Sequence, residues 1–210
     1  MLIKSIICKV SDEKKELFSA AQEQWGELNA LDGFYGQIGG WDESEACIVS
    51  LWENMKMYQS FMNESHDKIF NDNNQESTYT SCETELYQSL FDMSETPFVE
   101  ALAHSSFLRI AICDVKQESE KQFLHMQETV WNPGMERAEG MMGGVVGRSL
   151  SSNRYIVLSL WKDEAAHRHY VKEIFPQLLH TANLSQQVLH IEGKQTTLVN
   201  SWAVLPVHCK

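Results

Sequence analysis

Long apolar runs are missing from this sequence of 210 residues. No stretch approaches the ~18 consecutive apolar residues of a membrane-spanning helix. The opening MLIKSIICKV is too short and too alternating for a signal peptide. We therefore expect a cytoplasmic protein that has no membrane partner.

Metal-binding and nucleotide-binding motifs are also missing. The five cysteines are odd in number and contain no CxxC pair, which argues against a disulfide framework and against a thiolate metal site. No GKS/T loop, GxSxG elbow or HExxH motif occurs. The sequence thus predicts no metal site and no cofactor. Four cysteines lie in strand-like runs, where cysteine usually acts as a small core residue: Cys8, Cys47, Cys82 and Cys113.

Basic residues are scarce in the first half of the chain. Residues 1–96 hold 6 lysines and no arginine against 18 acidic residues, whereas residues 97–210 hold 11 basic and 11 acidic residues. The whole chain carries a formal net charge of -12. Phosphate backbones and anionic lipids repel such a surface, so we expect neither a nucleic acid nor a membrane partner.

The chain contains an internal repeat. The stretch SLW ending at Trp52 recurs 109 positions later at Trp161, and Trp25 recurs 106 positions later at Trp131. The opening LIKSIICKV faces FLRIAICDV at an offset of 105, and GFYGQIGGW faces GMMGGVVGRS at 107. Four landmarks in the same order predict a tandem duplication with small insertions in loops.

Each copy has the pattern β-α-β-β-α-β, with strands marked by apolar alternation and helices by apolar residues at helical spacing. The fold class that this predicts is α+β, with two ferredoxin-like units. We assign copy one to residues 1–93, a linker to 94–106 and copy two to 107–210. One face of each sheet needs cover beyond its own helices, so we expect the sheets to pack face to face as a pseudo-dimeric α/β barrel. The chain would then be a monomer that acts as a pseudo-dimer, or a homodimer.

A family resemblance rests on the strand that ends in tryptophan and the helix after it, WENMKMYQSFMNESH in copy one and WKDEAAHRHYVKEIF in copy two. With the glycine-rich turn LDGFYGQIGGW, these stretches resemble the dimeric α/β-barrel superfamily of antibiotic-biosynthesis, quinol and haem-degrading monooxygenases. The resemblance covers nearly the whole chain as two copies. It implies a ligand pocket between each sheet and its own helices, near the second helix.

In that family, many cofactor-independent oxygenases carry histidines nine and fourteen positions after the tryptophan. Copy one has Phe61 and His66 at these positions, and copy two has Tyr170 and Phe175. His66 lies on the apolar face of its helix, where a neutral imidazole can take a proton from a phenol or quinol. The enzyme hypothesis is therefore a cofactor-independent monooxygenase acting on a small aromatic or quinol-type substrate. Its pocket residues are Trp52, Tyr58, Phe61 and Met62 in copy one and Trp161 and Tyr170 in copy two.

Two alternatives stay open. His66 can instead be a partly buried structural histidine, satisfied by a backbone carbonyl or by a neighbour such as Asp67. The first alternative function is a barrel that binds a small apolar ligand, or serves as an interaction module, without turnover. The haem-degrading members of the superfamily have a different pattern, which includes an asparagine on the first strand and a histidine nineteen positions after the tryptophan. Copy two offers His180 at that place, but neither first strand contains asparagine. Haem binding through His180 is thus the second alternative.

The HRH triplet at residues 167–169 resembles a metal pair. However, residues two apart point to opposite sides of a helix and cannot hold one ion together. We interpret His167 and His169 as part of a solvated helix surface beside Arg168.

Overall fold

The computed structural model describes residues 1–206, so His208 and Cys209 lie outside the described residues. The described residues form two compact units, residues 1–86 together with 196–206, and residues 87–195. Both units combine an antiparallel sheet with helices, which confirms the predicted α+β class.

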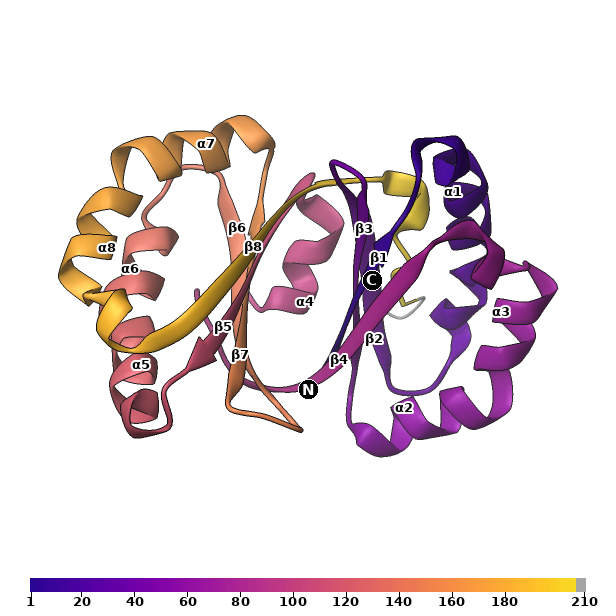
Figure 1. Ribbon diagram of the computed structural model, residues 1–210, viewed down its shortest axis with the longest axis horizontal. Coiled ribbons are helices and arrows are strands. Elements are labelled where there is room, and N and C mark those ends of the chain that lie inside the picture. Colours follow the sequence, from indigo (N-terminus) through magenta and orange to yellow (C-terminus); the bar gives the residue numbers. More distant parts are fainter. Residues whose placement is uncertain (207–210) are drawn as a thin grey trace. The chain divides into compact units, whose positions relative to one another are not determined.

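In unit 1 the helices lie on one face of the sheet (Figure 1). The second helical stretch begins at a polar turn directly after Trp52, where the Asn54 side chain accepts a hydrogen bond from Met57 N at 3.1 Å. That cap satisfies a backbone donor that the first helical turn leaves unpaired. The elements are β1 Leu2–Lys9, α1 Lys15–Glu23, η2 Gln24–Ala30, β2 Phe34–Asp42, β3 Glu45–Trp52, α2 Met55–Phe61, η3 Met62–His66, α3 Asp67–Asp72, η4 Gln75–Thr78 and β4 Ser81–Asp92.

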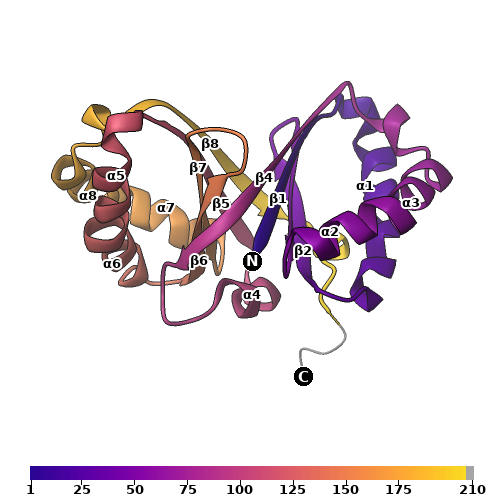
Figure 2. The same ribbon diagram turned by 90° about the horizontal axis from the view of Figure 1, so that it is seen from below.

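Unit 2 repeats this plan, with helices α5 to α8 on one face of its sheet (Figure 2). Asp163 replaces Asn54 as the cap and accepts a hydrogen bond from Ala166 N at 2.8 Å. The elements are α4 Phe98–Ala101, β5 Phe107–Val115, α5 Glu120–Met126, η7 Gln127–Trp131, α6 Asn132–Glu136, β6 Met141–Ser149, β7 Arg154–Trp161, α7 Glu164–Glu173, α8 Phe175–Ala182, η8 Leu184–Gln186 and β8 Val188–Leu198.

The strand registers of the two copies match. Leu2 pairs with Trp52 on β1 and β3, and Phe107 pairs with Trp161 on β5 and β7. In unit 1 the strand order is β1-β3-β2, with the end of β8 beside β2, and in unit 2 it is β5-β7-β6, with the end of β4 beside β6.

The two units do not coincide with the sequence copies 1–93 and 107–210. Strand β4 begins in unit 1, but from Tyr87 onward it pairs with β6 of unit 2. Strand β8 begins in unit 2, and its end at Thr197 and Leu198 pairs with β2 of unit 1. The end of each of these strands therefore belongs to the unit that does not contain its beginning.

The segment predicted as a linker, residues 94–106, contains helix α4 and belongs to unit 2. Phe98, Ala101 and Leu102 are buried, and α4 lies against β6 on the sheet face opposite α5 to α8 (Figure 1). Gly143 of β6 permits this approach, because a Cβ there would lie 2.8 Å from the Cβ of Ala101. The segment is therefore a packed part of the core.

Among residues 1–206, no helix is long and apolar enough to cross a membrane.

The residues that follow β8 form part of the core of unit 1. Trp202 is fully buried between the rings of Phe18 and Trp41, at centroid distances of 5.5 and 5.1 Å. We predict that Trp202→Ala lowers the free energy of unfolding by about 3–5 kcal/mol, because it leaves a large cavity. Leu205→Ala, at a more exposed site of the same segment, is the control and should cost below about 1 kcal/mol. Urea unfolding of both variants measures the difference, and equal effects would contradict this packing.

Candidate functional site

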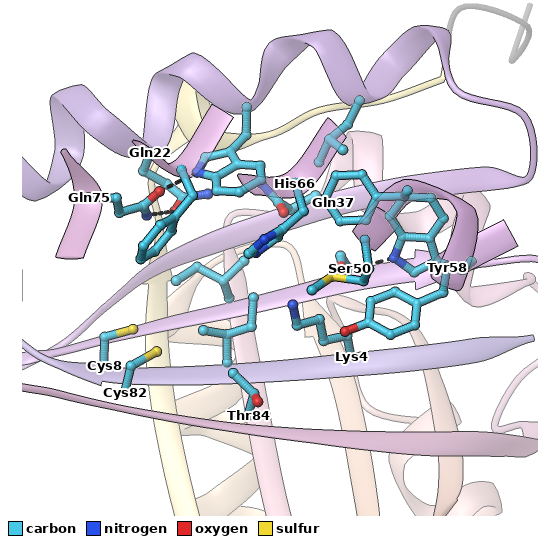
Figure 3. A pocket seen from close by; sticks show the side chains of 18 of the residues that line it. Lys4, Cys8, Gln22, Gln37, Ser50, Tyr58, His66, Gln75, Cys82 and Thr84 are labelled. Atoms are coloured by element: carbon cyan, nitrogen blue, oxygen red, sulfur yellow. Dashed lines mark hydrogen bonds between the residues drawn. The ribbon is translucent and has the colours of Figure 1, made fainter. Parts of the chain in front are cut away.

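Unit 1 encloses a cavity of about 340 Å³ between its sheet and its helices (Figure 3). Seven of the 20 residues that form its wall are phenylalanine, tyrosine or tryptophan. Every residue that the sequence assigned to a pocket in copy one lies on this wall: Trp52, Tyr58, Phe61, Met62 and His66. The apolar cavity expected beside His66 is therefore present, whereas the role of each residue stays a prediction.

Trp52 organises the aromatic wall. Its indole stacks on Phe61 at 4.8 Å between ring centroids and meets Phe34 and Tyr58 edge-on at 5.1 and 5.9 Å. The indole Nε1 donates to Ser50 Oγ at 3.3 Å. Because three neighbouring rings and a hydrogen bond hold the tryptophan in place, one side of the cavity has a rigid aromatic surface.

His66 ends a π-helical turn, η3, that interrupts the second helical stretch. Such turns are frequent at functional sites. The imidazole stacks on Phe70 at 5.7 Å and contacts Trp25 at 5.5 Å. Its Nδ1 lies 2.9 Å from Asp67 Oδ1. An ionised carboxylate only accepts hydrogen bonds, so Nδ1 carries the proton and Nε2 is left as the basic atom.

Lys4 is a site residue that the sequence did not reveal. It is only 8% exposed on β1, and burial lowers the pKa of its ammonium group. Its Nζ lies 5.4 Å from the ring centroid of Tyr58. Among the described residues that line the cavity there is no aspartate or glutamate, and Lys4 is the one lysine or arginine. A buried cation in an aromatic cavity favours an anionic ligand.

Buried amides supply the remaining polar groups of the cavity. Trp25 Nε1 donates to Gln75 Oε1 at 2.7 Å, and Gln75 Nε2 donates to Gln22 Oε1 at 3.3 Å. Gln37 also lines the cavity, and its buried Nε2 has no hydrogen-bond partner among residues 1–206. Gln37 therefore offers a hydrogen-bond donor that a ligand could use.

Unit 2 contains a second cavity of about 250 Å³ at the corresponding place. Tyr170 lines it, as the sequence predicted. Trp161, the other predicted pocket residue, is fully buried but is not among the residues that line the cavity. Its Nε1 donates a hydrogen bond to Ser159 Oγ at 3.0 Å, and Ser159 lines the cavity. His180 is exposed on α8 and is not among the residues that line the cavity. The structure therefore does not bring His180 to a site with Tyr170.

The interpretation of His167 as a solvated residue is wrong. Its side chain is 2% exposed, lines the second cavity and lies between the rings of Phe107 and Trp161 at 5.1 and 5.3 Å. Burial lowers its pKa to about 4, with a smaller effect of the Arg109 charge in the same direction. His169 and Arg168, its neighbours in the HRH triplet, are exposed as expected. The cavity histidine of copy two therefore stands where copy one has Tyr58.

An alignment of the two sequence copies could have revealed the cavity residues that the sequence analysis missed. Lys4 and Arg109 are separated by 105 positions, as are Gln22 and Gln127, and all four line cavities. A cation at the third residue of the first strand in both copies is unusual, because mainly apolar residues surround it. The repeat alone could therefore have identified these positions.

In residues 1–206 we find no group of three or more His, Cys, Asp or Glu side chains placed to hold a metal ion.

Comparisons with known proteins place the chain in a family. Residues 2–87 match a family model described as Domain of unknown function (DUF4937). The protein YdbC of Bacillus subtilis (strain 168), described as uncharacterized, is 38% identical over 114 residues. This match covers 52% of the present chain and 92% of YdbC.

Two solved structures share the fold over nearly the whole chain. One, named "Putative monooxygenase", is from Fusobacterium nucleatum subsp. nucleatum ATCC 25586. It has a TM-score of 0.77 and 13% identity, and the match covers 97% of this chain and 94% of that one. The other is an anthrone oxidase-like protein with a TM-score of 0.70 and 12% identity, over 95% and 91% of the two chains. Identities this low show the fold alone.

Burial of His167 predicts a pH dependence of stability. Its pKa is about 4 in the folded protein and 6.5 for an unperturbed histidine, so between these values the unfolded state binds more protons. The contribution of His167 is complete near pH 7 and is lost as the pH falls from about 6.5 to about 4. From pH 7 to pH 5 this group should lower the free energy of unfolding by roughly 2 kcal/mol.

Urea unfolding at the two pH values measures this loss, and His167→Phe, which cannot titrate, should reduce it by that amount. His169→Phe, at the exposed site, is the matched control and should leave it unchanged. An unaltered pH dependence in His167→Phe would contradict the buried, neutral imidazole.

Proposed function

The chain belongs to the same family as the Bacillus subtilis protein YdbC, and from its cavities we propose that it is a monooxygenase-like enzyme. Its substrate is a small phenol or quinol, which unit 1 oxidises with molecular oxygen. The main support for this proposal is that Lys4 from the sheet and His66 from the helical side point into one aromatic cavity (Figure 3).

The polar groups of the cavity suit a phenol. His66 Nε2 takes the hydroxyl proton, and the Lys4 ammonium stabilises the resulting phenolate oxygen. Gln37 Nε2 donates a further hydrogen bond to that oxygen, which satisfies its unpartnered donor. The aromatic rings beside Trp52 contact the faces of the substrate.

The electron-rich phenolate is the reductant in this reaction. It transfers an electron to oxygen, and the resulting pair combines at a ring carbon that carries hydrogen, opposite the hydroxyl in a phenol and next to it in a quinol. One oxygen atom stays on that carbon as a carbonyl, and the other leaves as water with the ring hydrogen and the hydroxyl hydrogen. A phenol and one O₂ thus give a quinone and one water, and no external reductant is consumed.

The size of the cavity limits the substrate. A volume of about 340 Å³ lies at the small end of the usual range for ligand sites, so it suits a compound of one or two fused rings. The names of the two solved structures with the same fold, a monooxygenase and an anthrone oxidase-like protein, agree with oxygen chemistry on such compounds.

The alternative of a binding module without turnover uses the same cavity and differs only in the outcome of the assay. The haem alternative depended on His180, and the exposed position of that side chain on α8 leaves haem without its proposed ligand.

Oxygen consumption tests the enzyme proposal. We expect the protein to consume oxygen with 1-naphthol or 1,4-naphthoquinol, and His66→Gln to lower kcat by about 10²- to 10⁴-fold, the usual contribution of a general base. His180→Gln, an exposed histidine outside both cavities, is the matched control and should keep full activity. Binding of these compounds without oxygen uptake would reject catalysis in favour of the binding module.

Lys4→Met separates ligand binding from stability. Methionine matches the shape of the lysine stem but removes the buried charge, so we expect the free energy of unfolding to rise by roughly 1–2 kcal/mol. Affinity for 1-naphthol should fall about ten- to hundred-fold, because a charge-assisted hydrogen bond is lost. Tryptophan fluorescence titration and urea unfolding measure the two effects. Unchanged affinity in Lys4→Met would show that the lysine does not contact the hydroxyl.

A further inference from the structure

The two cavities share a tryptophan and a glutamine but differ in what joins them. In unit 1, the carboxamide of Gln75 lies between Trp25 and Gln22. Its oxygen accepts from Trp25 Nε1 at 2.7 Å, and its nitrogen donates to Gln22 Oε1 at 3.3 Å. One amide group therefore satisfies a donor and an acceptor at once.

In unit 2 the corresponding tryptophan and glutamine are Trp131 and Gln127, the two ends of the π-helical turn η7. They are 5% and 4% exposed, and both line the cavity. Trp131 Nε1 and Gln127 Oε1 are buried without a hydrogen-bond partner among residues 1–206. A donor and an acceptor that are paired in unit 1 are thus both unsatisfied in unit 2.

The missing partner can be traced to one residue. Asn74 and Asn183 adopt the same left-handed conformation, with φ of 48° and 47°, and begin corresponding turns. The next residue is Gln75 in unit 1 and Leu184 in unit 2. Leu184 packs against the core cluster that contains Trp131 and also lines the cavity. An apolar side chain therefore stands where the internal carboxamide would be.

We propose that the cavity of unit 2 is a binding site for a small aromatic carboxamide. The ligand carbonyl accepts from Trp131 Nε1, and the ligand N–H donates to Gln127 Oε1, as Gln75 does in unit 1. The ring occupies the apolar space beside Tyr170 and Phe175, and Leu184 turns aside to admit the amide. This site does not depend on the oxidation proposed for unit 1.

An amide suits this pair better than a carboxylate. A carboxylate has no hydrogen to give to Gln127 Oε1 and would place a negative charge against that oxygen. The cation of the cavity, Arg109, is already engaged by strand β8, because its Nη1 donates to Lys194 O at 3.3 Å. The guanidinium also packs closely against Gly193 of the same strand, since a Cβ at that position would be 2.3 Å from Nη2.

Indole N–H signals in ¹⁵N NMR spectra test the proposal with benzamide as the probe and benzoate and toluene as competitors. The signal of Trp131, assigned by its loss in Trp131→Phe, should shift with benzamide at lower concentration than with benzoate or toluene. Leu184→Gln supplies the missing amide from within the chain, and it should weaken benzamide binding at least ten-fold. Leu189→Gln, the same change at a site that is 74% exposed, should bind like the parent protein.

Gln75→Leu gives the reciprocal test, because it should make the Trp25 signal respond to benzamide. Gln127→Leu should remove the preference for benzamide over toluene even if Leu184→Gln does not fold. The proposal is overturned if benzoate or toluene shifts Trp131 as readily as benzamide, or if a folded Leu184→Gln binds benzamide unchanged. If unit 1 does not oxidise any of the proposed substrates, the expected results of these binding tests stay the same.

Discussion

Both cavities depend on the indole of the tryptophan that ends the third strand of each copy. Trp52 and Trp161 are buried, and each donates its N–H to a serine two residues earlier on the same strand. The hydrogen bond removes the cost of burying the indole N–H, so the ring can lie deep between sheet and helices. In unit 1 the indole itself lines the cavity and gives it one rigid aromatic side. In unit 2 the serine that accepts the indole hydrogen bond, Ser159, lines the cavity instead.

The two units have the same arrangement of strands and helices but different polar groups in their cavities. The first strand contributes a lysine to one cavity and an arginine to the other, and the second helical stretch contributes His66 to one and His167 to the other. These histidines stand at different positions and in different surroundings. His66 is oriented by Asp67, whereas burial among rings holds the pKa of His167 well below its usual value. This difference is the basis for proposing proton transfer in unit 1 and recognition of a neutral group in unit 2.

Much of the fold could be predicted, and less of the site. The apolar strands, the tryptophan landmarks and the helices after them appear where periodicity placed them, since these patterns depend on neighbours a few residues apart. The pocket residues of copy one were found because one helix face contains most of them. His167 was misplaced because its neighbours Arg168 and His169 are polar, although it shares a helix face with Tyr170, three residues later, and that face is buried. Lys4 was missed because a lone lysine on a strand usually faces solvent.

By itself, the sequence determined the succession of strands and helices and the α+β class, since these follow from local spacing and from the internal repeat. The aromatic pocket of copy one was expected from the family resemblance. Only the tertiary structure decided that the segment 94–106 buries Phe98, Ala101 and Leu102, that β4 and β8 each run from one unit into the other, and which polar groups share a cavity. It also decided that Gln75 satisfies Trp25 while Leu184 leaves Trp131 unpaired. The physical reason is that hydrogen bonding and burial depend on side chains brought together from distant positions, and local spacing carries no information about those partners.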